Sequence, residues 1–164
     1  MLEYAITARR TTPARGTASS ARAAEASVSL DTAPEGRADA FNPAELLLTA
    51  VAACMLKGIE RVRPMLGFSL RGATVHVHGI RQDVPPRLVR IDYELAVDTD
   101  ESDERLDLLH RNVRKYGTIY NTLAEAVQLT GTIRRADSAA REAASAPLAA
   151  AAPSARDASI DEIC

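Results

Sequence analysis

The chain has 164 residues, of which 46% are hydrophobic and 26% charged, and its formal net charge is −2. This length allows one domain with a sizeable core, and the nearly balanced charge argues against binding to nucleic acid or to an anionic membrane surface. No positively charged start followed by an apolar run opens the chain, so we predict no secretory signal. The two cysteines, Cys54 and Cys164, are too few for a disulfide framework and favour a reducing, cytoplasmic location.

Charge and composition change near residue 136. Residues 1–135 hold 18 Lys/Arg and 17 Asp/Glu, whereas residues 136–164 hold 2 and 5. Twelve of these last 29 residues are alanine, with serine, proline and charges between them and no amphipathic stripe. We therefore predict one domain over 1–135 and a disordered tail over 136–164.

Two segments near the start alternate apolar and polar residues, which is the pattern of strands. They cover Leu2–Arg9 and Ala24–Leu30. A turn-rich connection over 11–20 joins them, and a surface loop over 31–40 follows.

Residues 41–64 carry the clearest helix signal of the sequence. Asn42 suits the N-cap, Pro43 suits the first helical position, and Glu45 stands where it completes a capping box. Pro64 supplies the predicted end. Because apolar residues are spread round this helix, we expect it to be buried on most sides as the central helix of the core. Its charged residues leave too short an apolar run for a membrane span.

The rest of the domain predicts a hairpin, two helices and a last strand. We expect strands at Phe68–Arg81, with a break at Gly72, and at Leu88–Val97. A helix that begins within 98–103 follows and runs to about Tyr116. A short helix capped by Thr118 then runs to Ala126, and a last strand covers Val127–Ile133. The first two strands form an antiparallel hairpin, and Gly117 separates the helices. This order predicts an α+β fold in which helices cover one face of a mainly antiparallel sheet.

Cys54 lies in the middle of the long helix, among alanines, and two interpretations of it remain open. Core cysteines are common and inert. Lys57 and Arg61, one and two turns further on, lie on roughly the same side of the helix, and a nearby cation favours the thiolate that attacks peroxides and disulfides. Cys54 is therefore either core filling or a reactive thiol with Lys57 beside it.

Glu45 belongs to the same helix but cannot serve the same thiol. It lies nine residues before Cys54, which is ~13.5 Å along the helix axis and about half a turn round it. Its first expected role is the helix cap. If it acts on a thiol, that thiol belongs to a second subunit.

The segment over 110–122 is dense in hydrogen-bonding groups around a helix break. It either lines a pocket or satisfies the helix ends. Our candidate substrate-binding residues are Arg61, Tyr116, Thr118 and Asn121.

His76 and His78 lie two apart on a predicted strand and therefore project from one face. A metal site would need a third ligand, for which only His110 remains among the histidines. We predict that the protein binds no metal.

The segment from Asn42 to Cys54, NPAELLLTAVAAC, resembles the segment of the OsmC/Ohr family that opens the central helix and ends on its reactive cysteine. The order of strands, long helix, hairpin, helix and final strand is similar too, over residues 1–135. The resemblance implies an OsmC-like fold and an intertwined homodimer with two sites at the subunit interface. It also implies that Cys54 is the thiol that reduces organic hydroperoxides, assisted by an Arg and a Glu.

The sequence departs from this family pattern at three points. The family's catalytic Glu follows Pro directly, where this chain has Ala44, so that Glu45 matches only the next position. The family's Arg comes from the N-terminal strands, and neither Arg15 nor Arg22 aligns with it. The family's second cysteine precedes a proline at the start of the last helix, whereas residues 116–119 here are Tyr-Gly-Thr-Ile.

We therefore predict a one-cysteine thiol peroxidase of the oxidative stress response that acts on organic hydroperoxides. Cys54 would attack, with Lys57 and the other subunit's Glu45 assisting. An external thiol or dithiol would reduce the oxidised cysteine, because Cys164 at the end of the tail is not organised for this step. The alternative is a non-catalytic dimer that binds a small apolar or thiol-containing molecule between its subunits. Neither function requires a cofactor, a nucleic acid or a membrane.

Overall fold

The computed structural model describes residues 2–11 and 18–137, so the predicted tail lies almost entirely outside the described residues. Its elements are, in chain order, the strands β1 (Thr7–Thr11), β2 (Ala18–Ala23) and β3 (Ala26–Ser29), the helix α1 (Pro43–Leu66), the strands β4 (Gly72–Gln82) and β5 (Arg87–Asp98), the helices α2 (Asp103–Lys115) and α3 (Thr118–Ala124), and the strand β6 (Gln128–Arg135). The predicted α+β order is confirmed. The division into a domain over 1–135 and a tail over 136–164 stays a prediction.

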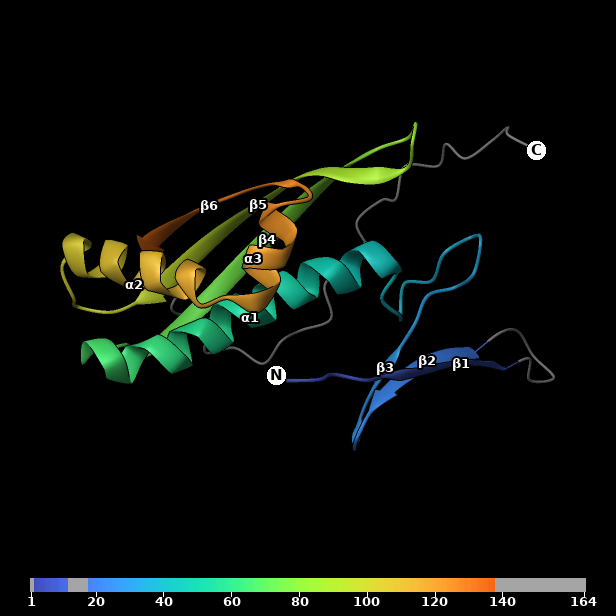
Figure 1. Ribbon diagram of the computed structural model, residues 1–164, viewed down its shortest axis with the longest axis horizontal. Coiled ribbons are helices and arrows are strands. Elements are labelled where there is room, and N and C mark those ends of the chain that lie inside the picture. The colour runs from blue at the N-terminus through green and yellow to red at the C-terminus, as the bar shows by residue number, and fades with distance from the viewer. Residues whose placement is uncertain (1, 12–17, 138–164) are drawn as a thin grey trace.

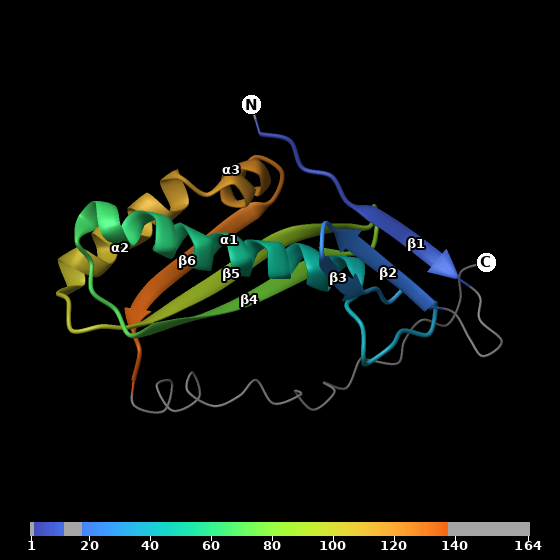
Figure 2. The same ribbon diagram turned by 90° about the horizontal axis from the view of Figure 1, so that it is seen from below.

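Two three-stranded sheets and one layer of helices make up the described structure (Figure 1). In the main sheet, β5 is central, antiparallel to β4 and parallel to β6. The three helices lie on one face of this sheet, where α1 contacts β4 and α2 contacts β6 (Figure 2). The strands β1, β2 and β3 form a separate antiparallel sheet beside the N-terminal half of α1. The sheets are therefore mainly antiparallel, as predicted.

The core forms between β5 and the helices. Alternate β5 residues Ile91, Tyr93, Leu95 and Val97 are buried, which confirms the face predicted from the alternation. The helices add Val51, Met55, Ile59 and Val62 from α1 and Leu106, Leu109 and Val113 from α2. Each such side chain contributes roughly 1.5–3 kcal/mol on burial, so this contact is the main source of stability in the described residues.

The start of α1 is fixed by the predicted capping box. The Asn42 side chain accepts a hydrogen bond from the Glu45 N–H at 3.0 Å, and the Glu45 carboxylate accepts one from the Asn42 N–H at 2.9 Å. Two of the N–H groups that a helix start leaves unpaired are thus satisfied by local side chains.

The predicted end of α1 is wrong. Pro64 lies inside the last turn, and the helix continues to Leu66. Gly67 then takes the left-handed conformation, with φ 56°, and the Phe68 N–H donates to the Arg63 carbonyl at 3.0 Å. Proline removes only one N–H donor, and the last turn tolerates this loss. The helix ends instead at Gly67, because its positive φ turns the chain so that the next N–H groups bond to the last helical carbonyls.

The expectation that α1 is buried on most sides is also wrong. Its buried residues, Val51, Met55, Gly58, Ile59 and Val62, follow one face. Leu47 and Leu56 on other faces are 36% and 41% exposed. Within the described residues, no helix has both the length and the apolar composition needed to cross a membrane.

The N-terminal strands differ most from their prediction. β1 begins at Thr7, and residues 2–6 pair with no strand in the described part of the chain although their sequence alternates. Ala24 and Glu25, predicted to start a strand, form the turn between β2 and β3, and Ala24 has φ 51°. Alternation alone does not make a strand, since a strand also needs a neighbour for its backbone hydrogen bonds.

Two glycines mark other boundaries that were predicted differently. Gly72 begins β4 rather than interrupting a strand, and Phe68 before it packs into the core from the end of α1. Gly117, not Thr118, is the N-cap of α3, which ends at Ala124.

Gly131 of β6 gives a stability prediction. It lies opposite Tyr93 of β5, and a Cβ built on it would overlap the Cε1 and Cζ atoms of the Tyr93 ring. The ring occupies the place of a side chain, so we expect Gly131→Ala to lower the free energy of unfolding in urea by about 2 kcal/mol. Gly72→Ala is the matched control, because nothing lies within 4 Å of its added Cβ. Equal stability of the two variants would contradict this account of the Tyr93 ring.

Candidate functional site

Cys54 lies where α1 meets the turn between α2 and α3. Its side chain is a half-buried free thiol. A Cβ built on Gly117, the N-cap of α3, would lie 3.2 Å from the Cys54 Sγ. The sulfur therefore rests against the backbone of Gly117, with no side chain between them.

The same close approach occurs one turn further along α1. A Cβ built on Gly58 would lie 2.9 Å from Cγ1 and 3.5 Å from the carbonyl oxygen of Val113 in α2. Residues 54 and 58 are neighbours on one helix face. Cys54 is consequently held at a contact between elements, where rigid backbone fixes its position.

Tyr116 lies directly before Gly117 and carries two cations on its ring. Arg61 of α1 has its Cζ 5.3 Å from the ring centroid, and Lys115 of α2 has its Nζ 5.4 Å from it. Each such contact stabilises by roughly 0.5–1 kcal/mol at an exposed site. Two helices thus bring positive charge to one ring, on the residue before the glycine that Cys54 contacts.

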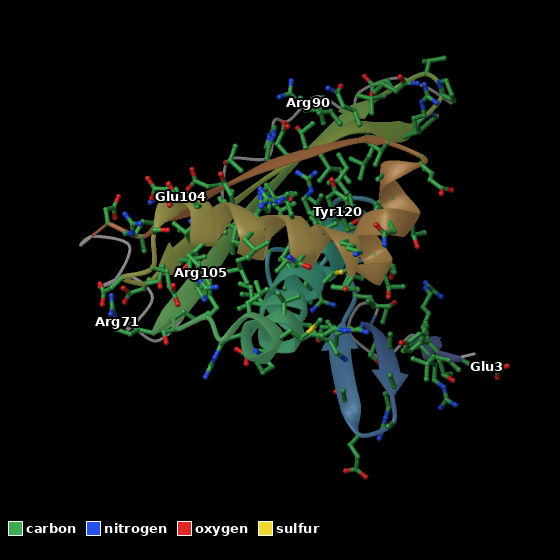
Figure 3. The ribbon with its side chains drawn as sticks, turned by 60° about the vertical axis from the view of Figure 1, so that its left-hand side comes forward. Glu3, Arg71, Arg90, Glu104, Arg105 and Tyr120 are labelled. Carbon is green, nitrogen blue, oxygen red and sulfur yellow. The ribbon has the colours of Figure 1, made fainter. Side chains whose placement is uncertain are left out.

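A buried polar pair lies on the sheet side of the α2–α3 turn. The Tyr93 Oη and the His110 Nε2 are 2.6 Å apart, and both side chains are buried. The Tyr120 ring packs edge-on against Tyr93, and the Arg114 guanidinium lies 5.6 Å from the Tyr120 ring centroid. Figure 3 shows Tyr120 in the helical layer, at the other end from Arg71.

Burial sets the protonation of this pair. Loss of solvation raises the pKa of Tyr93, and the neighbouring Tyr120 hydroxyl raises it further. Loss of solvation also lowers the pKa of His110 to about 4, with the positive Arg114 acting in the same direction. A neutral phenol and a neutral imidazole therefore share the hydrogen bond at pH 7.

Glu45 is separated from Cys54 within one chain. Its carboxylate belongs to the capping box at the start of α1. Nine helical residues place it ~13.5 Å from Cys54 along the axis and about half a turn round it. A catalytic role of Glu45 stays a prediction, and it requires a second copy of the chain.

The remaining candidates lie close to this corner in the sequence. Lys57 is exposed one turn after Cys54 on α1, and Thr118 is exposed at the first turn of α3. The Asn121 side-chain amide donates to the Lys115 carbonyl at 3.2 Å, which ties α3 to the end of α2. This contact satisfies a helix end, one of the two roles considered for the segment. Substrate binding by these residues stays a prediction.

The histidines do not come together. His76 and His78 are exposed on β4, whereas His110 is buried against Tyr93. Across residues 2–11 and 18–137, no group of three or more His, Cys, Asp or Glu side chains could hold a metal ion.

Sequence analysis missed the residues that shape the site without reacting. Gly117 was recognised only as a helix break, although glycine is a common N-cap and that signal was available. The roles of Gly58 and of the Tyr93–His110 pair depend on contacts between elements distant in the sequence. No local pattern signals such contacts.

Comparison with protein-family models matches residues 36–131 to the family described as OsmC-like protein. This range runs from the loop before α1 into β6 and includes Cys54 and the α2–α3 turn. Comparison with curated proteins gives no match.

Solved structures with a similar fold carry related names. An OsmC-like protein from Mycoplasma pneumoniae matches with a TM-score of 0.72 and 20% identity, over 83% of this chain and 99% of that one. An organic hydroperoxide resistance protein OsmC from Legionella pneumophila matches at 0.61 and 16%, over 81% and 98%. The organic hydroperoxide resistance protein OhrB of Bacillus subtilis matches at 0.58 and 17%, over 81% and 98%. At these identities the likeness shows the fold alone.

The lowered pKa of His110 predicts a loss of stability in acid. Below pH 6.5 the unfolded chain binds a proton at this imidazole, whereas the folded protein does so only near pH 4. The stabilisation is therefore complete above pH 6.5 and is lost between pH 6.5 and about 4, by up to about 3 kcal/mol. Urea unfolding of the wild type and of His110→Gln across this range measures it. A variant with the same pH dependence as the wild type would contradict the assignment.

The contact between Gly117 and Cys54 predicts a disulfide in a variant. The 3.2 Å from a Gly117 Cβ to the Cys54 Sγ leaves room for a sulfur on that Cβ at the S–S bond length of ~2.0 Å, and the φ of −80° at Gly117 suits any residue. We expect Gly117→Cys, in a Cys164→Ser background, to lose both free thiols on mild oxidation, as measured by alkylation and mass spectrometry.

Two matched variants control this experiment. Gly117→Ser adds similar bulk without a second thiol, and Gly117→Cys combined with Cys54→Ser removes the partner. Each should keep its one remaining cysteine in the reduced form, or at most form dimers between chains. Two alkylatable thiols in the oxidised Gly117→Cys protein would show that the α1 contact is looser than described.

Proposed function

Because the chain belongs to the OsmC-like protein family, we propose that it is a thiol-dependent peroxidase that reduces organic hydroperoxides through Cys54. The observation that carries the proposal is the place of Cys54, a half-buried free thiol held against Gly117, which directly follows Tyr116 and its two cations. A fixed position favours attack along one direction.

In the first step the Cys54 thiolate attacks the distal oxygen of the hydroperoxide. A sulfur–oxygen bond forms and the oxygen–oxygen bond breaks. The organic part leaves as an alkoxide and takes up a proton to become the alcohol. Cys54 is then a sulfenic acid, oxidised by two electrons.

In the second step an external thiol reduces Cys54. Its sulfur attacks the sulfenic sulfur, a mixed disulfide forms and water leaves. A second thiol, or the other thiol of a dithiol, attacks the mixed disulfide and releases Cys54. Residues 116–119 contain no cysteine that could replace the external thiol, which supports a one-cysteine cycle. The cytoplasmic location predicted from the sequence would supply such thiols.

A homodimer is part of this proposal. Apolar side chains before β1 are left exposed, with Leu2 at 82%, Tyr4 at 84% and Ile6 at 67%. Together with the separate sheet β1–β3, they offer a surface that a second copy would cover. Only a second copy would bring a Glu45 to Cys54, because the carboxylate of the same chain is too far along α1.

The other candidates receive supporting roles. Lys57 and Arg61 would favour the thiolate, and Glu45 of the second copy would orient one of these cations. Tyr116, with Thr118 and Asn121 of α3, would line the place of the organic group. These roles follow from position alone, since each of these residues lies on α1, at the α2–α3 turn or on α3.

A non-catalytic binding protein is the alternative. Its support is that Ala44 stands where the family pattern has its Glu and that Gly117 stands in the segment where the pattern has its second cysteine. Such a protein would hold a small apolar or thiol-containing molecule between its subunits without oxidising Cys54.

Turnover of cumene hydroperoxide with dithiothreitol separates the two functions. We expect Cys54→Ser to lose at least about a hundredfold in rate, because it removes the nucleophile. Cys164→Ser is the matched control and should keep the wild-type rate. Loss of dithiothreitol thiols, corrected for the reaction without protein, measures the rate.

Equal rates for the wild type and Cys54→Ser would contradict the peroxidase. Cumyl alcohol, the product, then tests the alternative by titration calorimetry. Saturable binding that is the same in both proteins, without turnover in either, would assign the non-catalytic function.

A further inference from the structure

Three cations, here called the cation cluster, lie near Cys54 and Gly117 in the sequence, on the turns of α1 after Cys54 and at the end of α2 before Gly117. They are Lys57 and Arg61 of α1 and Lys115 of α2. Arg61 and Lys115 reach the same Tyr116 ring from different helices, at 5.3 and 5.4 Å from its centroid. Side chains on a helix lean toward its N-terminus, so Arg61 leans back toward Cys54, which lies two turns earlier.

The cation cluster has no acidic partner in the described residues. None of its members forms an ion pair within 4 Å there. The acids nearest in the sequence are Glu60 and Asp107. Glu60 pairs with Arg63 at 3.8 Å, and Asp107 forms no ion pair within the same residues.

Many arginines elsewhere in the described structure are paired with an acid, although Arg9, Arg22, Arg87, Arg111 and Arg114 form no ion pair within 4 Å there. The pairs are Arg71 with Asp98 and Asp100, Arg81 with Asp83, Arg90 with Asp92, Arg105 with Glu101, Arg134 with Glu94 and Arg135 with Asp103. Lys57 and Arg61, four residues apart on α1, are instead a like-charge pair, which weakens a helix. The α2 dipole accounts for Lys115 at its C-terminal end but not for these two.

We propose that the cation cluster binds the carboxylate of a small reactant whose thiol or hydroperoxide group meets Cys54. This inference rests on the proposed function and names a chemical class for one of its two reactants. Arg61 supplies a planar donor pair suited to a carboxylate, and Lys115 a second charge. Tyr116 directly precedes Gly117, which the Cys54 sulfur contacts, so the proposed reactant carries its carboxylate a few bonds from the reacting atom.

The cluster stays positive in the dimer of the proposed function. Glu45 of a second copy would add one carboxylate to three cations, so an excess of positive charge would remain. The excess would also attract an anionic reactant before it binds.

Alkylation of Cys54 tests the cluster without any need for turnover. Iodoacetate and iodoacetamide have similar shapes and differ in charge, so the ratio of their rate constants at Cys54 reports the local potential. We expect Arg61→Gln and Lys115→Gln each to lower the ratio of iodoacetate to iodoacetamide about threefold at low salt. Raising the ionic strength from ~0.01 M to ~0.15 M shortens the screening length from ~30 to ~8 Å and should lower the wild-type ratio as well.

Arg90→Gln is the matched control, since it removes the same charge from an arginine that is paired with Asp92 on β5. Its ratio should equal that of the wild type. Ratios that are the same in all four proteins and insensitive to salt would overturn the proposal, even if Cys54 proves to be a peroxidase. If the ratio falls in Arg61→Gln and Lys115→Gln but the wild type shows no turnover, the anion site is supported and the peroxidase function is contradicted.

Turnover then shows which reactant carries the carboxylate. The reductants 3-mercaptopropionate and 2-mercaptoethanol are compared at equal thiolate concentration, and cumene hydroperoxide is compared with its para-carboxylate. An advantage of the anionic reactant that falls about threefold in Arg61→Gln, but not in Arg90→Gln, assigns the site to that reactant. No such advantage with either pair would overturn the assignment to a reactant.

Discussion

The direct approach of α1 to the α2–α3 turn is the constraint on which the site depends. Gly58 meets Val113 there, and Cys54 meets Gly117. Helices normally lie 8–10 Å apart, depending on the side chains between them. In each of these two contacts one partner is a glycine, which has no side chain to hold the elements apart. A side chain at Gly58 would meet Val113 and push α1 outward, and the thiol would lose the backbone that holds it. The same approach places Tyr116 within reach of Arg61.

The surroundings of the thiol differ between its two sides. Toward the sheet, burial keeps Tyr93 and His110 neutral, so these two residues add no charge to the site. Toward solvent, Arg61 and Lys115 add positive charge on the Tyr116 ring. An organic molecule with an apolar body and an anionic end would match both sides, whereas a wholly apolar or a wholly ionic molecule would match one.

Features that depend on contacts within one helix or strand were predicted correctly from the sequence, whereas contacts between distant elements were missed. Asn42 and Glu45 cap α1 through bonds within one turn, and the β5 alternation defines its buried face, so both were predicted correctly. The contact of Cys54 with Gly117 joins elements separated by a hairpin and a helix, and no local pattern signals it. The end of α1 was misplaced because Pro64 is a strong signal that the last turn tolerates.

The Tyr93 ring fills the space that a side chain on Gly131 would take, and it touches both His110 of α2 and Tyr120 of α3. The Tyr93 ring is thus in contact both with β6 and with the two helices that flank Gly117. A continuous series of contacts therefore joins β6 to the helices on either side of Gly117. Altered packing of the sheet would then change the reactivity of the Cys54 thiol. The rate at which Cys54 is alkylated would therefore report on packing elsewhere in the protein.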